Sequence, residues 1–203
     1  MTGFADFLSG NWLASAGTTF LLVGLAEIGD KTQLLALVLA AKFRKPVPII
    51  LGILAATLVN HAMAGVAGAW ISAAIGPVAM RWILGISFIA MAAWTLIPDK
   101  LDDDGDRDKA PRFGVFGTTL VAFFLLEMGD KTQIATVALA AKYSSLVAVV
   151  AGTTLGMMLA NVPAVLLGEV AAKKLPMKVV HRIAAGIFFV LGVSVLLGFG
   201  SLA

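Results

Sequence analysis

The sequence LAEIGDKTQ at residues 25–33 recurs as LLEMGDKTQ at residues 125–133. Each copy sets a glutamate, an aspartate and a lysine in surroundings that are otherwise mostly apolar. A charged side chain at the centre of a membrane-spanning helix costs roughly 2.5–3.5 kcal/mol, so these charges are expected to face one another or water rather than lipid. The two copies therefore predict a polar site inside an apolar protein.

The composition indicates an all-α integral membrane protein. Of the 203 residues, 60% are hydrophobic and 13% are charged, and the mean hydropathy is +0.97, far outside the range of soluble globular proteins. The absence of cysteine excludes disulfides and thiolate metal sites. Apolar runs bounded by charges, proline or glycine predict six transmembrane helices, at residues 13–42, 47–72, 79–98, 114–142, 146–171 and 179–200.

The first and fourth predicted spans are longer than a bilayer requires. A helix needs roughly 20 residues to cross the hydrocarbon core, whereas each of these runs is about 30 residues long. We therefore expect both helices to tilt, kink or break near Gly29 and Gly129, the glycines of the two motifs.

The similarity between the two halves extends beyond the motifs. Residues 17–43 and 117–143 both begin with GTT, contain GDKTQ and end in LAAK followed by an aromatic residue. We interpret the chain as two three-helix repeats, residues 1–98 and 113–203, joined by an acidic cytoplasmic linker at residues 99–112. Because each repeat crosses the membrane an odd number of times, the second is expected to be inverted relative to the first. Secondary transporters with this architecture bind substrate near the midplane, between the repeats.

The basic residues predict the orientation. Most lysines and arginines fall in the loops at residues 42–45, 100–112 and 173–182, which lie on one side of a six-span protein. Cytoplasmic loops carry the excess of basic residues. We therefore expect a multi-pass protein of the cell inner (plasma) membrane, with the N-terminus and the C-terminus outside.

The motif residues predict a cluster of oxygen ligands. On a continuous helix, Glu27 lies on one face with Asp30 and Lys31, at spacings of three and four residues. Two such helices would bring together Glu27, Asp30, Glu127 and Asp130, and further oxygens are expected from Thr32, Thr132, Gln33, Gln133, Asn60 and Asn161. A simpler alternative is that each motif is a buried ion pair between glutamate and lysine that fixes helix packing.

The charge balance favours a metal site over that alternative. Four acids and two lysines leave two negative charges, which one divalent cation would cancel. Oxygen ligands suit Ca²⁺, Mn²⁺ and Mg²⁺, whereas Cu⁺ and Zn²⁺ prefer cysteine or clustered histidine. Clustered acids can also take up protons when a cation leaves, so exchange of metal for protons is chemically natural. By themselves the residues predict a divalent-cation transporter.

The two copies of Glu-x-Gly-Asp-Lys-Thr, in a six-span chain of this length, resemble the Gdt-type cation/proton antiporter family. The resemblance is specific at Glu27, Gly29, Asp30, Lys31, Thr32 and at Glu127, Gly129, Asp130, Lys131, Thr132. It implies export of Mn²⁺ from the cytoplasm, with Ca²⁺ as a second substrate, and with the motif acids as metal ligands and proton carriers. The partners so implied are a divalent cation, protons and the lipid bilayer, with no cofactor and no nucleic acid.

Two alternative functions remain open from the sequence. A passive divalent-cation channel could use the same carboxylate cage, and only dependence on a proton gradient separates it from an antiporter. An intramembrane aspartyl protease is the remote alternative, because Gly-Asp also occurs in its spanning helices. Here Glu27 and Glu127 stand where the first glycine of that protease motif would be, and Tyr143 is the only tyrosine. We therefore expect no enzymatic activity.

Overall fold

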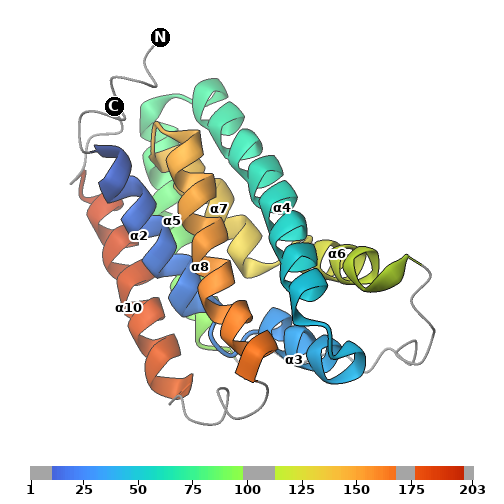
Figure 1. Cartoon of the computed structure of the whole chain (residues 1–203). Helices are drawn as coiled ribbons and strands as arrows, with labels where there is room; N and C mark the ends of the chain where they lie inside the picture. The colour runs from blue at the N-terminus through green and yellow to red at the C-terminus, as the bar shows by residue number, and fades with distance from the viewer. Residues whose placement is uncertain (1–10, 98–112, 168–176, 199–203) are drawn as a thin grey trace.

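The computed structural model describes residues 11–97, 113–167 and 177–198, and in these ranges the regular secondary structure consists of helices joined by short turns (Figure 1). The all-α expectation is confirmed for these residues, while the linker at 99–112 lies outside them. In chain order the described helices are α2 (Asn11–Glu27), α3 (Lys31–Phe43), α4 (Pro46–Ala74), α5 (Pro77–Thr95), α6 (Gly114–Glu127), α7 (Lys131–Lys142), α8 (Leu146–Leu167) and α10 (Met177–Leu196).

Four of the described helices, α4, α5, α8 and α10, are each long and apolar enough to cross a membrane. Helices α2 and α3 meet the same criteria only as a pair, and this pair is bent by 68° at the break between them. Helix α6 is apolar but shorter. By length and composition the described residues therefore contain four or five candidate spans.

Both long segments break at the motif glycine, as predicted. Helix α2 ends at Glu27 and α3 begins at Lys31, while α6 ends at Glu127 and α7 begins at Lys131. The backbone φ is 85° at Gly29 and 76° at Gly129. Only glycine adopts such angles without steric cost, because it has no Cβ. The glycines thus explain why a continuous helix does not form here.

A glutamine braces each break in the same way. The backbone N–H of Gly29 donates to Oε1 of Gln33 over 2.8 Å, and that of Gly129 donates to Oε1 of Gln133 over 2.7 Å. The backbone N–H of each glycine lies outside the regular helical hydrogen-bond pattern, and the glutamine side chain four residues later provides its acceptor.

The broken helix of each repeat packs on the straight helix of the other repeat. Gly152 on α8 lies against the Ala16 carbonyl and the Thr19 side chain of α2. In the same way, Gly52 on α4 is so close to α6 that an added Cβ would lie 2.9 Å from the Phe116 carbonyl oxygen. The two contacts match at an offset of one hundred residues, so the sequence repeat is also a repeat of packing.

The breaks fall between two apolar clusters. The first cluster contains residues of α2, α5, α7, α8 and α10, including Phe88 and Phe188, whose ring centroids lie 6.4 Å apart. The second contains residues of α3, α4, α6 and α8. Figure 1 accordingly shows α3 at the lower right and α6 at the right, away from α5 and α10. The chain therefore passes from one cluster to the other at each motif.

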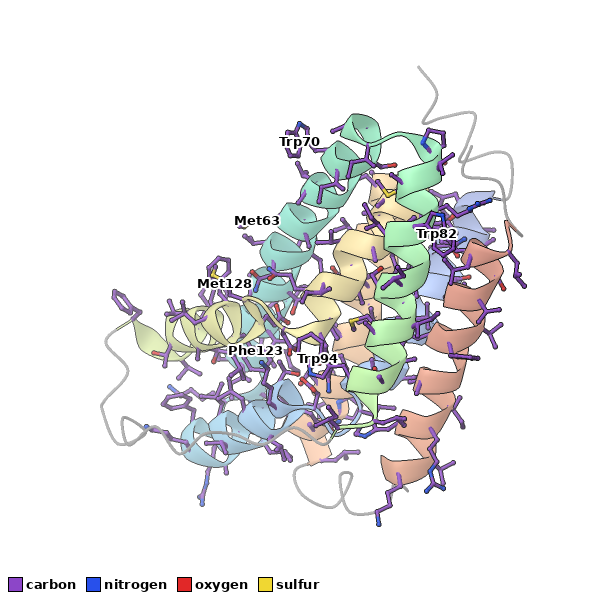
Figure 2. All side chains as sticks on the ribbon, turned by 180° about the vertical axis from the view of Figure 1, so that it is seen from behind. Met63, Trp70, Trp82, Trp94, Phe123 and Met128 are labelled. Atoms are coloured by element: carbon purple, nitrogen blue, oxygen red, sulfur yellow. The ribbon has the colours of Figure 1, made fainter. Side chains whose placement is uncertain are left out.

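The outer surface of the helices is rich in large apolar side chains. Trp70 is 72% exposed and Trp82 52% exposed, and both point outward toward one end of the molecule, whereas Trp94 lies toward the other end (Figure 2). Exposed apolar surface on this scale is what a bilayer covers, and indole rings suit its interfaces.

Candidate cation site

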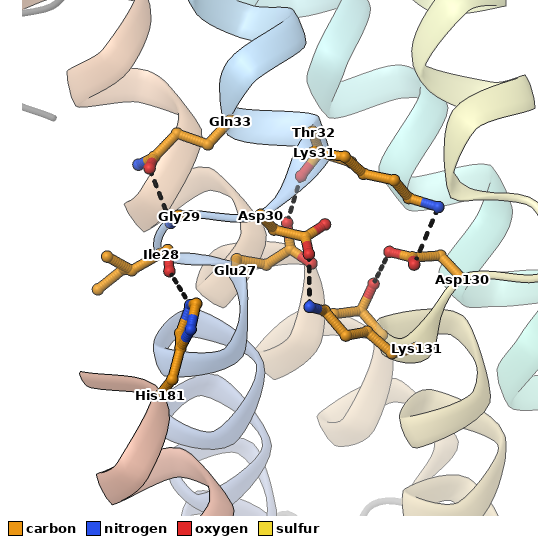
Figure 3. A network of polar contacts seen from close by, with 11 residues as sticks. Glu27, Ile28, Gly29, Asp30, Lys31, Thr32, Gln33, Asp130, Lys131 and His181 are labelled. Carbon is orange, nitrogen blue, oxygen red and sulfur yellow. Dashed lines mark hydrogen bonds and ion pairs between the residues drawn. The ribbon is translucent and has the colours of Figure 1, made fainter. Parts of the chain in front are cut away.

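The two motifs exchange ion pairs across the repeats (Figure 3). Nζ of Lys131 lies 2.7 Å from Oδ1 of Asp30, and Nζ of Lys31 lies 3.1 Å from Oδ1 of Asp130. The expectation that Glu27 and Lys31 share one helix face is wrong, because the helix is interrupted between them. Each lysine instead reaches the aspartate of the opposite motif.

Three buried carboxylates gather at the junction of the breaks. Oxygens of Glu27, Asp30 and Asp130 lie within 4.8 Å of one another, and these residues are 0%, 0% and 3% exposed. Asp30 and Asp130 occupy the N-cap positions of α3 and α7, where the helix dipole favours negative charge. We refer to these three residues as the carboxylate group.

The two carboxylate oxygens of Glu27 differ in their contacts. Its Oε2 accepts a hydrogen bond of 2.5 Å from the Thr32 hydroxyl. Within the part of the chain that the structure describes, its Oε1 has no hydrogen-bond partner. An unsatisfied buried carboxylate oxygen is costly unless a ligand or proton meets it, which makes this atom a candidate cation ligand.

Glu127 is placed differently from its counterpart. Its Oε1 accepts from the Thr57 hydroxyl over 3.0 Å and its Oε2 from Nδ2 of Asn60 over 2.9 Å. Glu127 does not belong to the carboxylate group, whose members lie within 4.8 Å of one another. Thr57 is a site residue that the sequence interpretation missed, although it stands three residues before Asn60 on the same helical face.

The other predicted ligands differ in the contacts they make around the carboxylate group. Oε1 of both Gln33 and Gln133 is taken by the glycine N–H groups, and Nε2 of Gln33 donates to the Ala160 carbonyl over 2.9 Å. The two glutamines therefore brace the breaks instead of presenting their oxygens to the carboxylate group. The Thr132 hydroxyl lies 3.5 Å from Oδ2 of Asp130, beside that group. Asn161 turns its Nδ2 to the Met157 carbonyl of its own helix.

His181 on α10 supports the first break, and the sequence interpretation did not select it. Its Nε2 lies 2.7 Å from the carbonyl oxygen of Ile28 (Figure 3). The tautomer protonated at Nε2 donates to this carbonyl, which precedes Gly29. A carbonyl released by the helix break is thereby satisfied.

A buried carboxylate group at two matched helix breaks, inside a bundle of apolar helices, is the arrangement expected of a membrane protein that handles cations. Comparison with known proteins supplies the family. The chain belongs to the family described as divalent cation/proton antiporter GDT1, whose model matches residues 15–103 and 115–200. It is therefore a cation transporter and a multi-pass membrane protein, and not an enzyme.

Two relatives illustrate the family. The chain is 49% identical over 173 residues to a Vibrio cholerae protein named "Putative manganese exporter", covering 85% of each chain. It is 30% identical over 190 residues to a GDT1-like protein of Synechocystis sp., covering 85% of this chain and 92% of the relative. No solved structure matches the chain.

Proposed function

We propose that this protein is a secondary transporter that exports Mn²⁺ from the cytoplasm in exchange for protons, with Ca²⁺ as a second substrate. The observation that carries the proposal is the carboxylate group, in which Glu27, Asp30 and Asp130 converge in a fully buried site. The name of the Vibrio cholerae relative supports manganese and the outward direction.

The chemistry of the site suits a hard or borderline divalent cation. The candidate ligands nearest the junction are carboxylate and hydroxyl oxygens, which Mn²⁺ and Ca²⁺ accept. The motif acids Glu27, Asp30, Glu127 and Asp130 outnumber Lys31 and Lys131 by two charges, and the ion pairs at 2.7 and 3.1 Å use both lysines. A divalent cation would neutralise the remaining charge.

Proton exchange follows from the same burial. When the cation leaves, carboxylates that stay ionised in a low-dielectric site carry a large desolvation penalty. Uptake of protons removes this penalty, so the transporter can complete its cycle with no metal bound at the site. Glu27 is the candidate proton carrier, because one of its oxygens is uncommitted among the described residues.

The architecture we propose is six spans in two inverted three-helix repeats, residues 1–98 and 113–203. In it α2 with α3, and α6 with α7, each form one broken span. Equivalent breaks at Gly29 and Gly129 and the reciprocal packing of Gly52 and Gly152 support this assignment. The distribution of basic residues supports placement in the inner membrane with both termini outside.

Transport by purified protein in proteoliposomes tests the function. Vesicles with an acidic lumen, clamped at zero membrane potential, should accumulate external Mn²⁺ above its equilibrium level and lose protons as they do so. A passive channel would instead let Mn²⁺ run down its own gradient, with no accumulation driven by the proton gradient. Ca²⁺ and Zn²⁺ in parallel vesicles test selectivity, and transport of Zn²⁺ in preference to both Mn²⁺ and Ca²⁺ would contradict the oxygen site.

A further inference from the structure

The packing contacts give a position-by-position correspondence between the two straight helices. Gly52 meets Phe116 and Thr119, whereas Gly152 meets Ala16 and Thr19, so α4 and α8 correspond at an offset of one hundred. Both helices continue without interruption beyond these glycines. Continued along the helices beyond these glycines, the same offset pairs Thr57 with Met157, Asn60 with Ala160 and His61 with Asn161.

This correspondence reveals a difference in how the two motif glutamates are held. Thr57 and Asn60 donate to the two oxygens of Glu127 over 3.0 and 2.9 Å. The corresponding Met157 and Ala160 have no side-chain hydroxyl or amide to donate to Glu27. The nearby Asn161 is occupied with its own helix, where Nδ2 lies 3.0 Å from both the carbonyl oxygen and Sδ of Met157.

The carboxylate group reflects the same difference. Glu27 lies within it, and Oε1 of Glu27 has no hydrogen-bond partner among the described residues. Glu127 is outside it, with both oxygens engaged by α4. The two glutamates are equivalent in the sequence motif but not in their surroundings, because α4 and α8, the straight helices packed on the two broken segments, differ at two corresponding positions.

From this we infer that Glu27 and Glu127 have different roles in cation transport. Glu27 is the ligand that takes and releases the cation, whereas Thr57 and Asn60 are positioning residues that hold Glu127 back from the ion. The inference rests on the proposed function, since it assumes that the transported ion sits at the carboxylate group. Three carboxylates bind a divalent cation more weakly than four, and weaker binding favours release during each transport cycle.

Equilibrium binding of radioactive Mn²⁺ to the full-length protein in detergent tests this difference in roles. Glu27→Gln should weaken binding at least about tenfold more than Glu127→Gln does, an effect of the size seen when ligands and their supporting shells are changed. Equal weakening by the two variants would overturn the inference and leave the proposed function intact. Failure of the parent protein to bind Mn²⁺ or Ca²⁺ would overturn both.

Substitution of Thr57 tests the positioning role separately. Thr57→Val removes the hydroxyl at similar size and frees one oxygen of Glu127, so the Kd for Mn²⁺ should fall about three- to tenfold while maximal transport slows. Thr57→Ser keeps the hydroxyl and should restore parental values. A purely structural role predicts lower thermal stability with an unchanged Kd, and that result would refute the inference.

Thr153→Val supplies the matched control. Thr153 is a fully buried threonine on α8, and its hydroxyl donates to the Val149 carbonyl of its own helix over 2.9 Å. Its removal should leave the Kd for Mn²⁺ unchanged. A fall in Kd equal to that of Thr57→Val would show that loss of any buried hydroxyl has this effect, which would overturn the positioning role.

Discussion

At the scale of single residues, the crossed lysines organise the site. Lys131 and Asp30 are 1% and 0% exposed in their side chains and lie 2.7 Å apart. A buried ion pair adds little net stability, because desolvation of both charges offsets their attraction. What the pairs do provide is geometry, since each lysine draws the aspartate of the other motif to the junction. Asp30 and Asp130 are thereby held close enough to share one cation.

Replacing one residue of the buried Lys131–Asp30 pair should lower the stability of the protein far more than replacing both. We expect Lys131→Met to lower the free energy of unfolding by about 3–5 kcal/mol, because the buried carboxylate of Asp30 would lose the positive charge of Lys131. The double variant Lys131→Met with Asp30→Asn should recover much of this loss. Reversible unfolding in mixed detergent micelles measures both values.

The exposed residue Lys178 provides the control for this pair. Lys178→Met should change stability by no more than about 0.5 kcal/mol, as for most surface substitutions. If Lys131→Met had an equally small effect, the ion pair with Asp30 would not contribute to the fold as described.

At the scale of secondary-structure elements, the helix breaks turn two long segments into four short helices whose ends meet at the site. Because α3 and α7 begin at Lys31 and Lys131, their positive N-terminal ends face the aspartates that precede them. Gln33, Gln133 and His181 satisfy polar backbone groups that the breaks release. The breaks are therefore supported features of the fold and not local irregularities.

The left-handed backbone at the second break should make its glycine hard to replace. An added Cβ at Gly129 would meet nothing within 4 Å, so any cost of Gly129→Ala comes from the φ of 76°. That cost is about 1–2 kcal/mol for a residue with a side chain. We expect a lower midpoint of thermal unfolding and slower Mn²⁺ uptake.

Gly186→Ala is the matched control for this substitution. Gly186 lies within α10 and also has nothing within 4 Å of an added Cβ. Alanine favours a helix over glycine by up to about 1 kcal/mol, so this variant should be as stable as the parent or slightly more stable. A similar loss of stability in both variants would contradict the explanation from backbone strain.

At the scale of the whole molecule, the two repeats surround the site without being equivalent. Helix α10 packs on α2 and α5 packs on α7, while α3 and α6 belong to the second apolar cluster. The site therefore lies between the two apolar clusters, which share α8.

The inverted arrangement makes a direct topological prediction. Lys42 lies in the last turn of α3 and Ser144 lies two residues beyond the end of α7, so they occupy nearly equivalent places in the two repeats. They should nevertheless face opposite sides of the membrane. Because the chain contains no cysteine, Lys42→Cys and Ser144→Cys can be labelled singly in intact cells. An impermeant maleimide should label position 144 from outside and position 42 only after the membrane is opened. Labelling of both from the same side would rule out the inverted repeat.

The sequence alone predicted the class of the protein, the repeat, the position of both helix breaks and three acids that the structure brings together. These features are local, since composition, spacing and the special backbone freedom of glycine act within a few residues.

The contacts between the repeats depended on the tertiary structure. A motif spacing of three or four residues predicted that Glu27 and Lys31 share a face, and it failed because the break rotates the two halves of the segment apart. The pairing of each lysine with the opposite aspartate is a contact between the two repeats. The engagement of Glu127 by Thr57 and Asn60 depends on the register in which α4 packs on α6. That register is set by the close approach at Gly52, between segments that are distant in the chain.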